Sequence, residues 1–209
     1  MVSRIEVGSL RRLPLGAIGA VAEALGGSVD LMLRWEGAQL DRLTDAAHAW
    51  LTEATANLLA MAGWTVRTEV SFNHFGDRGR VDLLALHPTT RTLAVVEVKS
   101  AIGDVQETLG RLDSKARLGR TLAREAGWGD PAAIVRVLVV GDSRRDRRIV
   151  AEHERMFDAF LLRGRRGRAW LRHPRLPAPS GLLWFAKVPD SHGVSTTRHR
   201  RVRTVKSGG

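Results

Sequence analysis

The chain has 209 residues, 44% of them apolar, which is enough for one domain with a core of its own and a short appendage. It contains no cysteine, which excludes disulfides, thiolate zinc sites and cysteine nucleophiles and agrees with a cytoplasmic location. The net charge of +11 favours a polyanionic partner, nucleic acid first. No apolar stretch approaches the roughly 18 residues that a membrane-spanning helix requires, so we expect no membrane partner.

Apolar spacing predicts the secondary structure in chain order. The predicted elements are a helix over 39–62, strands over 64–72, 80–87 and 91–99, a helix over 104–126, a strand over 134–140, a helix over 144–163, and short strands over 168–172 and 182–187. Residues 88–90 form a turn, so the strands on either side of it should pair antiparallel. Both of these strands are apolar on both faces, which is typical of a central position in a sheet.

This order of elements predicts an α/β fold, a mixed β-sheet flanked by helices, with a short α-helical N-terminal segment. We expect three parts, residues 1–37, 38–189 and 190–209. The last part holds five basic residues and one acidic residue with few large apolar groups, so we expect a basic disordered tail.

Two adjacent predicted strands carry charged residues where apolar ones would be expected. Asp82 lies in the first strand of the hairpin, and Glu97 and Lys99 lie on one face of the second, because side chains alternate along a strand. Two carboxylates this close repel each other unless a cation lies between them. Oxygen ligands suit Mg²⁺ or Mn²⁺, which can activate water and stabilise a phosphodiester under attack. The alternative is a buried structural ion pair between Lys99 and one of the acids.

The pattern Gly79-Arg80-Val81-Asp82 followed by Glu97-Val98-Lys99, between two helices, resembles the PD-(D/E)XK nuclease superfamily over about residues 40–140. Val81 stands where the proline of the family name would be. The resemblance implies a restriction-endonuclease-like sheet and a Mg²⁺-dependent (or Mn²⁺-dependent) deoxyribonuclease. It implies that Asp82, Glu97 and the backbone carbonyl of Val98 bind the metal and that Lys99 assists hydrolysis.

Two further residues match positions that some members of this superfamily use. Glu53 corresponds to a glutamate on the first helix, and Gln106 opens the helix that follows the Glu-x-Lys strand. The resemblance therefore assigns both to the catalytic site. The alternatives are an ordinary solvated helix glutamate and a simple polar residue of a first helical turn.

Basic residues near this constellation could follow a DNA backbone. Arg78 and Arg80 flank Gly79, while Arg111, Lys115 and Arg117 lie on the following helix. A solvated basic surface is the alternative reading for each of them.

Residues 2–8, 17–18, 21–25 and 31 resemble the second half of an Xre-type helix-turn-helix domain, in which Ser3 and Arg4 would lie on or beside the recognition helix. A plain pair of amphipathic helices is the alternative.

The leading hypothesis is an endonuclease that hydrolyses DNA. A non-catalytic DNA-binding transcriptional regulator that uses a nuclease-like scaffold is the main alternative, and an interaction protein that docks an acidic partner is a third. Related nucleases often dimerise to cut both strands, an analogy that leaves a homodimer open.

Overall fold

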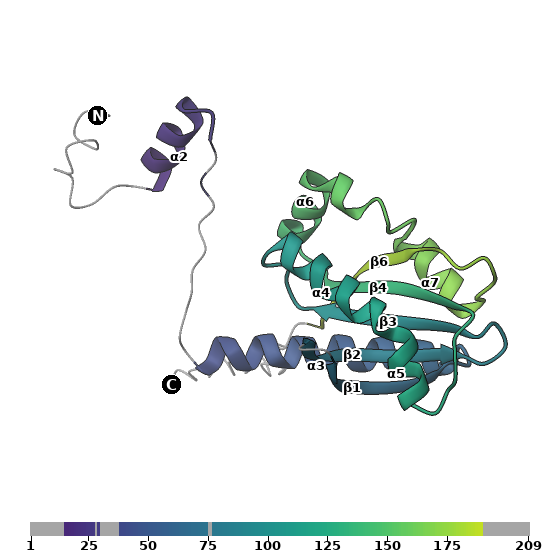
Figure 1. Ribbon diagram of the computed structural model, residues 1–209. Helices are drawn as coiled ribbons and strands as arrows, with labels where there is room; N and C mark the ends of the chain where they lie inside the picture. The colour runs from purple at the N-terminus through teal and green to yellow at the C-terminus, as the bar shows by residue number, and fades with distance from the viewer. Residues whose placement is uncertain (1–14, 28, 30–37, 75–76, 190–209) are drawn as a thin grey trace, which may run out of the picture. The chain divides into compact units, whose positions relative to one another are not determined.

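A six-stranded mixed β-sheet with helices on both faces makes up most of the part of the chain that the structure, a computed structural model, describes (Figure 1). The described residues are 15–27, 29, 38–74 and 77–189. The strands are β1 (Thr65–His74), β2 (Asp77–His87), β3 (Thr92–Lys99), β4 (Ala133–Gly141), β5 (Leu162–Arg163) and β6 (Gly181–Ala186). The helices are α2 (Leu15–Ala24), α3 (Ala38–Met61), α4 (Val105–Arg117), α5 (Gly119–Glu125), α6 (Arg144–Glu152), the 3₁₀ helix η1 (Glu154–Phe157) and α7 (Gly164–Arg172).

The strand order is β1-β2-β3-β4-β6-β5. β1, β2 and β3 pair antiparallel, whereas β3, β4, β6 and β5 run parallel to one another. This arrangement confirms the predicted mixed α/β sheet and is consistent with a restriction-endonuclease-like fold. The predicted hairpin is also confirmed, because the β2–β3 ladder closes at His87 and Thr92.

Apolar side chains form one core on each face of the sheet. α4 and α5 cover the first face through Leu112, Leu122 and Ala123, and we call this face the α4 side. α3 and α7 cover the other face, the α3 side, where Leu51 and Trp170 are buried. In Figure 1, α4 and α5 cross in front of the sheet and α3 runs behind it. With a core on each face, β3 is buried along nearly its whole length, as its apolar sequence predicts.

Three predicted elements differ in the structure. The helix expected over 104–126 breaks at Leu118, and the next residue, Gly119, packs so closely on the sheet that a Cβ there would lie 3.1 Å from side chains of β3 and β4. The helix expected over 144–163 ends at Glu152, and residues 162–163 instead pair with β6. The strand expected over 168–172 is wrong: α7 covers these residues and buries Gly167, Trp170 and Leu171 at helical spacing.

The chain divides into two compact units, Met1–Asp41 and Arg42–Gly209. In the first unit the structure describes α2, in agreement with the expected α-helical N-terminal segment. Ser3, Arg4 and the tail over 190–209 lie outside the described residues. Among the helices that are described, none combines the length and the apolar character needed to cross a bilayer.

Gly141, the last residue of β4, offers a test of the packing beside β3. A Cβ at this position would lie 2.3 Å from the carbonyl oxygen of Ser100, the residue after Lys99. We predict that Gly141→Ala lowers the free energy of unfolding by about 1–3 kcal/mol in urea denaturation, because the backbone must shift. Gly110→Ala is the control, since nothing lies within 4 Å of a Cβ on this exposed helical glycine, and it should stabilise α4 by up to about 1 kcal/mol. Equal stabilities of the two variants would contradict the packing argument.

Candidate functional site

The sheet opens between β2 and β3 where the predicted charged residues lie. The β2–β3 ladder ends at the pair Leu83–Val96, although β2 continues to pair with β1 and β3 continues to pair with β4 as far as Lys99. Asp82 and Glu97 are the first residues beyond the last shared pair. The backbone N–H of Val98 donates to Asp82 Oδ2 at 2.7 Å. The Asp82 carboxylate thus accepts a hydrogen bond from a backbone N–H of β3 that has no backbone partner on β2 at this point of the sheet. We call this opening the fork.

Strain on the neighbouring strand lies directly opposite Asp82. Glu69 of β1 has φ of +53°, and the β1–β2 ladder lacks a pair at this position. Such left-handed backbone is costly for a non-glycine residue. Val81 packs on the α4 side and Leu83 on the α3 side, whereas a regular strand would place both on one face. The irregularity in β2 is therefore centred on Asp82.

Glu97 is the most deeply buried group of the site, with 2% of its side chain exposed. Lys99 Nζ lies 2.8 Å from Oε1, and Lys115 of α4 donates a hydrogen bond to Oε2. The sequence separation of two places Lys99 on the same face as Glu97, whereas Lys115 comes from the helix that covers that face. Asp82, Glu97, Lys99 and Lys115 together carry no net charge. A buried carboxylate requires such partners, because an unpaired charge in the interior is expensive.

The pKa of Asp82 is raised, first by burial and next by the negative charge of Glu97. The N–H of Val98 and the charges of Lys115 and His48 oppose this rise. Two carboxylates whose charges act on each other in this way form a place where a cation is favoured.

Sequence reasoning missed His48, and it placed Lys115 on a DNA-contacting surface instead of beside Glu97. His48 lies on α3 one turn before the buried Leu51 and two turns before the buried Thr55. That helical spacing is the signal that could have indicated His48. No sequence signal paired Lys115 with Glu97, because their contact depends on how α4 docks on the sheet.

The donor set fits the expected divalent cation. Two carboxylates and a backbone carbonyl are hard oxygen ligands, and Mg²⁺ is commonly held by one or two carboxylates while it keeps several waters. The described residues contain no group of three or more His, Asp or Glu that could bind a metal, so such an ion would rely on water and substrate oxygens. Glu97 can ligate it only when a lysine moves aside. Lys99, with 29% of its side chain exposed, is freer to do so than Lys115 with 11%.

Glu53 and Gln106 are both exposed, on α3 and in the first turn of α4. Within the described residues, neither makes a hydrogen bond or ion pair with Asp82 or Glu97. The structure therefore does not bring these two predicted catalytic residues together with the other three.

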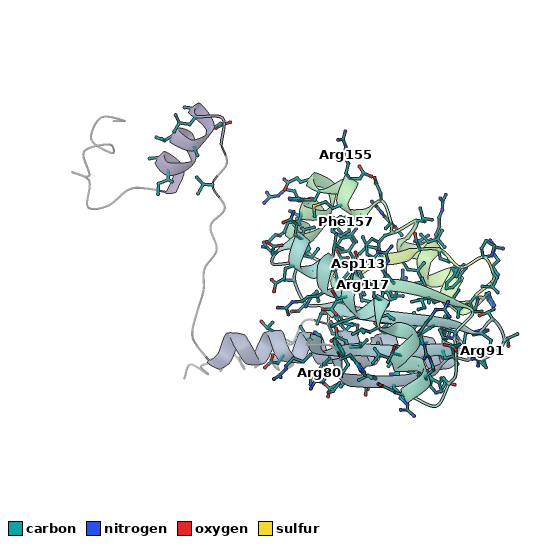
Figure 2. The ribbon with its side chains drawn as sticks, viewed as in Figure 1. Arg80, Arg91, Asp113, Arg117, Arg155 and Phe157 are labelled. Carbon is teal, nitrogen blue, oxygen red and sulfur yellow. The ribbon has the colours of Figure 1, made fainter. Side chains whose placement is uncertain are left out.

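The predicted DNA-binding residues do not form one continuous track. Arg78 and Arg80 lie on β2, where Arg80 pairs with Glu69 at 3.5 Å. Arg111 pairs with Glu107 on α4, and Lys115 is buried on Glu97. Arg117 donates to Ser114 Oγ and lines a cavity of about 380 Å³ with Asp113 and Arg136. Figure 2 shows Arg80 well separated from Asp113 and Arg117.

Removing Lys115 tests the charge balance around Glu97. We predict that Lys115→Met lowers the free energy of unfolding at pH 7 by about 3 kcal/mol, because it leaves one oxygen of a buried carboxylate without a partner. The matched control Lys99→Met also removes a partner of Glu97, but from a position where 29% of the lysine side chain is exposed and water can replace it, so it should lower this free energy by about 1 kcal/mol or less. Adding Glu97→Gln to Lys115→Met should recover part of the loss in chemical denaturation. An equal loss from the two lysine variants would show that burial of the pair is unimportant.

The raised pKa of Asp82 predicts a pH dependence of stability. Between its ordinary value of 3.8 and its raised value, the folded protein holds the proton more tightly than the unfolded chain does. Stability contributed by this group therefore falls as pH rises through that window and stays reduced above it. We predict that Asp82→Asn, whose side-chain oxygen can still accept from Val98, is more stable than the wild type at pH 7 and equal to it near pH 3. Thermal melts from pH 3 to 8 measure this, and parallel curves would refute it.

Comparison with known proteins gives no relative from which a role could be taken. No protein-family model matches the chain, and no curated protein matches it. What this site does is therefore argued from its residues and their geometry.

Proposed function

We propose that the protein is a metal-dependent endonuclease of the PD-(D/E)XK type that hydrolyses DNA phosphodiester bonds. The observation that carries this proposal is the fork, where Asp82, Glu97 and Lys99 meet at the point where β2 and β3 part. An acid pair with mutual repulsion and an adjacent ammonium is the minimum that metal-assisted phosphodiester hydrolysis needs.

Each residue has a role in this proposal. Asp82, Glu97 and the carbonyl of Val98 would hold Mg²⁺ or Mn²⁺. The bound metal would supply Lewis-acid stabilisation of the scissile phosphate and lower the pKa of water. The ammonium of Lys99, released from Glu97, can orient the attacking water or neutralise charge that develops on the phosphorus. Glu53 and Gln106 would need to approach the site from exposed positions to contribute.

DNA is the proposed partner because the chain is strongly basic overall, and a homodimer would allow both strands to be cut. The absence of cysteine supports a cytoplasmic location for the protein.

One observation favours the second candidate function, a DNA-binding regulator without catalytic activity. Both oxygens of Glu97 are paired with lysines, so the charges of the site balance without a cation. A scaffold that no longer used a metal would be stable in this form. The two functions are separated by whether DNA is cut.

We predict that the purified protein cuts DNA in the presence of Mg²⁺ or Mn²⁺ and loses this activity in EDTA. A panel of linear, supercoiled, single-stranded and branched DNA should be compared on gels. Asp82→Ala and Lys99→Ala should each reduce the cleavage rate by at least about a hundredfold, because each removes a group that acts on the reacting phosphate.

Two controls accompany this experiment: DNA binding by the two inactive variants, and cleavage by a variant that removes an exposed acid away from the site. Both variants should still shift the same DNA in EDTA, and Glu152→Gln on α6 should cut as fast as the wild type. A wild type that binds DNA but cuts no member of the panel would favour the regulator instead.

A further inference from the structure

The C-terminal part of the described chain carries an unbalanced positive charge. Residues 159–189 contain seven basic residues and no acidic residue. Five of these arginines lie on α7 or just after it and define what we call the α7 arginine surface: Arg165, Arg166, Arg168, Arg172 and Arg175. None of them belongs to the basic residues that the sequence motif indicated.

α7 turns these charges away from the core. Its buried residues are Gly167, Trp170 and Leu171, which pack on the α3 side of the sheet. Arg165, Arg168 and Arg172 recur at i, i+3 and i+7, on the opposite side of the helix. Arg165 and Arg172 are exposed, and Arg168 is half-buried. The helix therefore presents a row of guanidinium groups about 10 Å long, at a rise of 1.5 Å per residue.

Among the described residues, these five arginines lie together on one short segment without acidic partners, whereas the other exposed arginines that lack an ion pair, among them Arg78, Arg117, Arg144 and Arg155, are spread over separate elements. Within the described ranges, no carboxylate forms an ion pair with any member of the α7 arginine surface. By contrast, Arg124 pairs with Asp130 at 3.1 Å, and Arg148 pairs with Glu152 at 3.5 Å. The charge of α7 is therefore available to an external anion, whereas much of the charge elsewhere is already matched.

The placement of these charges also opposes the stability of the helix itself. Arg165 and Arg166 lie in the first turn, where the helix dipole is positive and where α7 has no acidic residue. Arg165 and Arg168, and Arg168 and Arg172, are like charges at i,i+3 and i,i+4. A bound polyanion would offset both the unfavourable interaction with the helix dipole and the repulsion between arginines. A basic surface that contacts only solvent would keep both destabilising effects.

We propose that the α7 arginine surface binds the phosphate backbone of duplex DNA. This inference rests on the proposed function and adds the surface on which the substrate is held. Planar guanidinium groups pair well with phosphate oxygens, and backbone contacts position a duplex without reading its sequence.

The sheet register gives the separation along the sheet between the start of α7 and the fork, although α7 packs on the α3 side and the Glu97 side chain faces α4. Glu97 pairs with Leu138, Leu138 with Leu183, and Leu183 with Arg163, immediately before α7. Three strand spacings of about 4.8 Å separate the ends of this row, about 14 Å in all. That distance corresponds to about four base pairs of duplex. A duplex that contacts both features would therefore have to lie across this edge of the sheet, where β3 ends and α7 begins.

The test compares two double variants of the full chain that remove the same charge. Arg165→Gln/Arg172→Gln removes two unpaired arginines of α7, and Arg124→Gln/Arg148→Gln removes two exposed arginines that are already ion-paired. Binding to a 25-base-pair duplex is measured by fluorescence anisotropy in EDTA across a salt series. We expect the α7 variant to flatten the slope of log K against log salt by about 1.8, which is two phosphate contacts, and to weaken binding about tenfold. The control should change the slope by less than half as much.

A second readout separates binding from damage to the fold. Without DNA, the α7 variant should melt at or above the wild-type temperature, because it loses repulsion on the helix. With DNA, its melting temperature should rise less than that of the wild type.

The outcomes distinguish this inference from the nuclease proposal. Equal slope changes in the two variants, or no binding of duplex by the wild type, would overturn the α7 inference even if the protein cuts DNA. A selective loss of binding in the α7 variant would support it, and would do so even if the wild type cut nothing and the nuclease proposal failed.

Discussion

The burial of Glu97 is the constraint on which the rest of the site depends. A carboxylate with 2% of its surface exposed needs partners for both oxygens, and only one of them can come from its own strand. The other comes from α4, so this helix must dock at one depth and one rotation. Several local features serve this docking. Asp104 caps the helix by accepting the N–H of Glu107 at 2.8 Å, and Gly119 lets the chain approach the sheet where α4 ends.

Residues of α6 hold the loop between Lys99 and α4 in place. Ile102 donates its N–H at 2.8 Å to Asp146 of α6, whose buried carboxylate also accepts from Ser143 Oγ. Arg145 donates to the carbonyl of Ile102 at 2.8 Å. These bonds anchor both backbone groups of one loop residue to the helix after β4. The position of Lys99 thus depends on α6 as well as on its own strand.

Much of the fold could be predicted from the sequence because local patterns determine it. The hairpin follows from two apolar strands joined by a short turn, and Gly63 and Gly127 end their helices with φ of +83° and +78°. The proximity of Asp82, Glu97 and Lys99 followed from strand alternation and the hairpin. Features that depend on contacts between distant segments could not be predicted. These are Lys115 beside Glu97, the exposure of Glu53, and the short β5 that replaces the end of a predicted helix. The strand expected over 168–172 was wrong because this short apolar run, Ala169-Trp170-Leu171 between two arginines, is too brief to show the three- and four-residue spacing of Gly167, Trp170 and Leu171 that α7 buries.

The neutral charge of the four-residue site has a consequence for how the protein would be handled. In sites built from acids alone, removal of the metal leaves repelling carboxylates, and chelation often unfolds the domain. Here the two lysines already balance the two acids, so the charge balance of the folded site does not depend on a bound cation. We therefore expect the fold to survive in chelator, and the metal of the proposed nuclease would have to displace a lysine from Glu97 in order to bind.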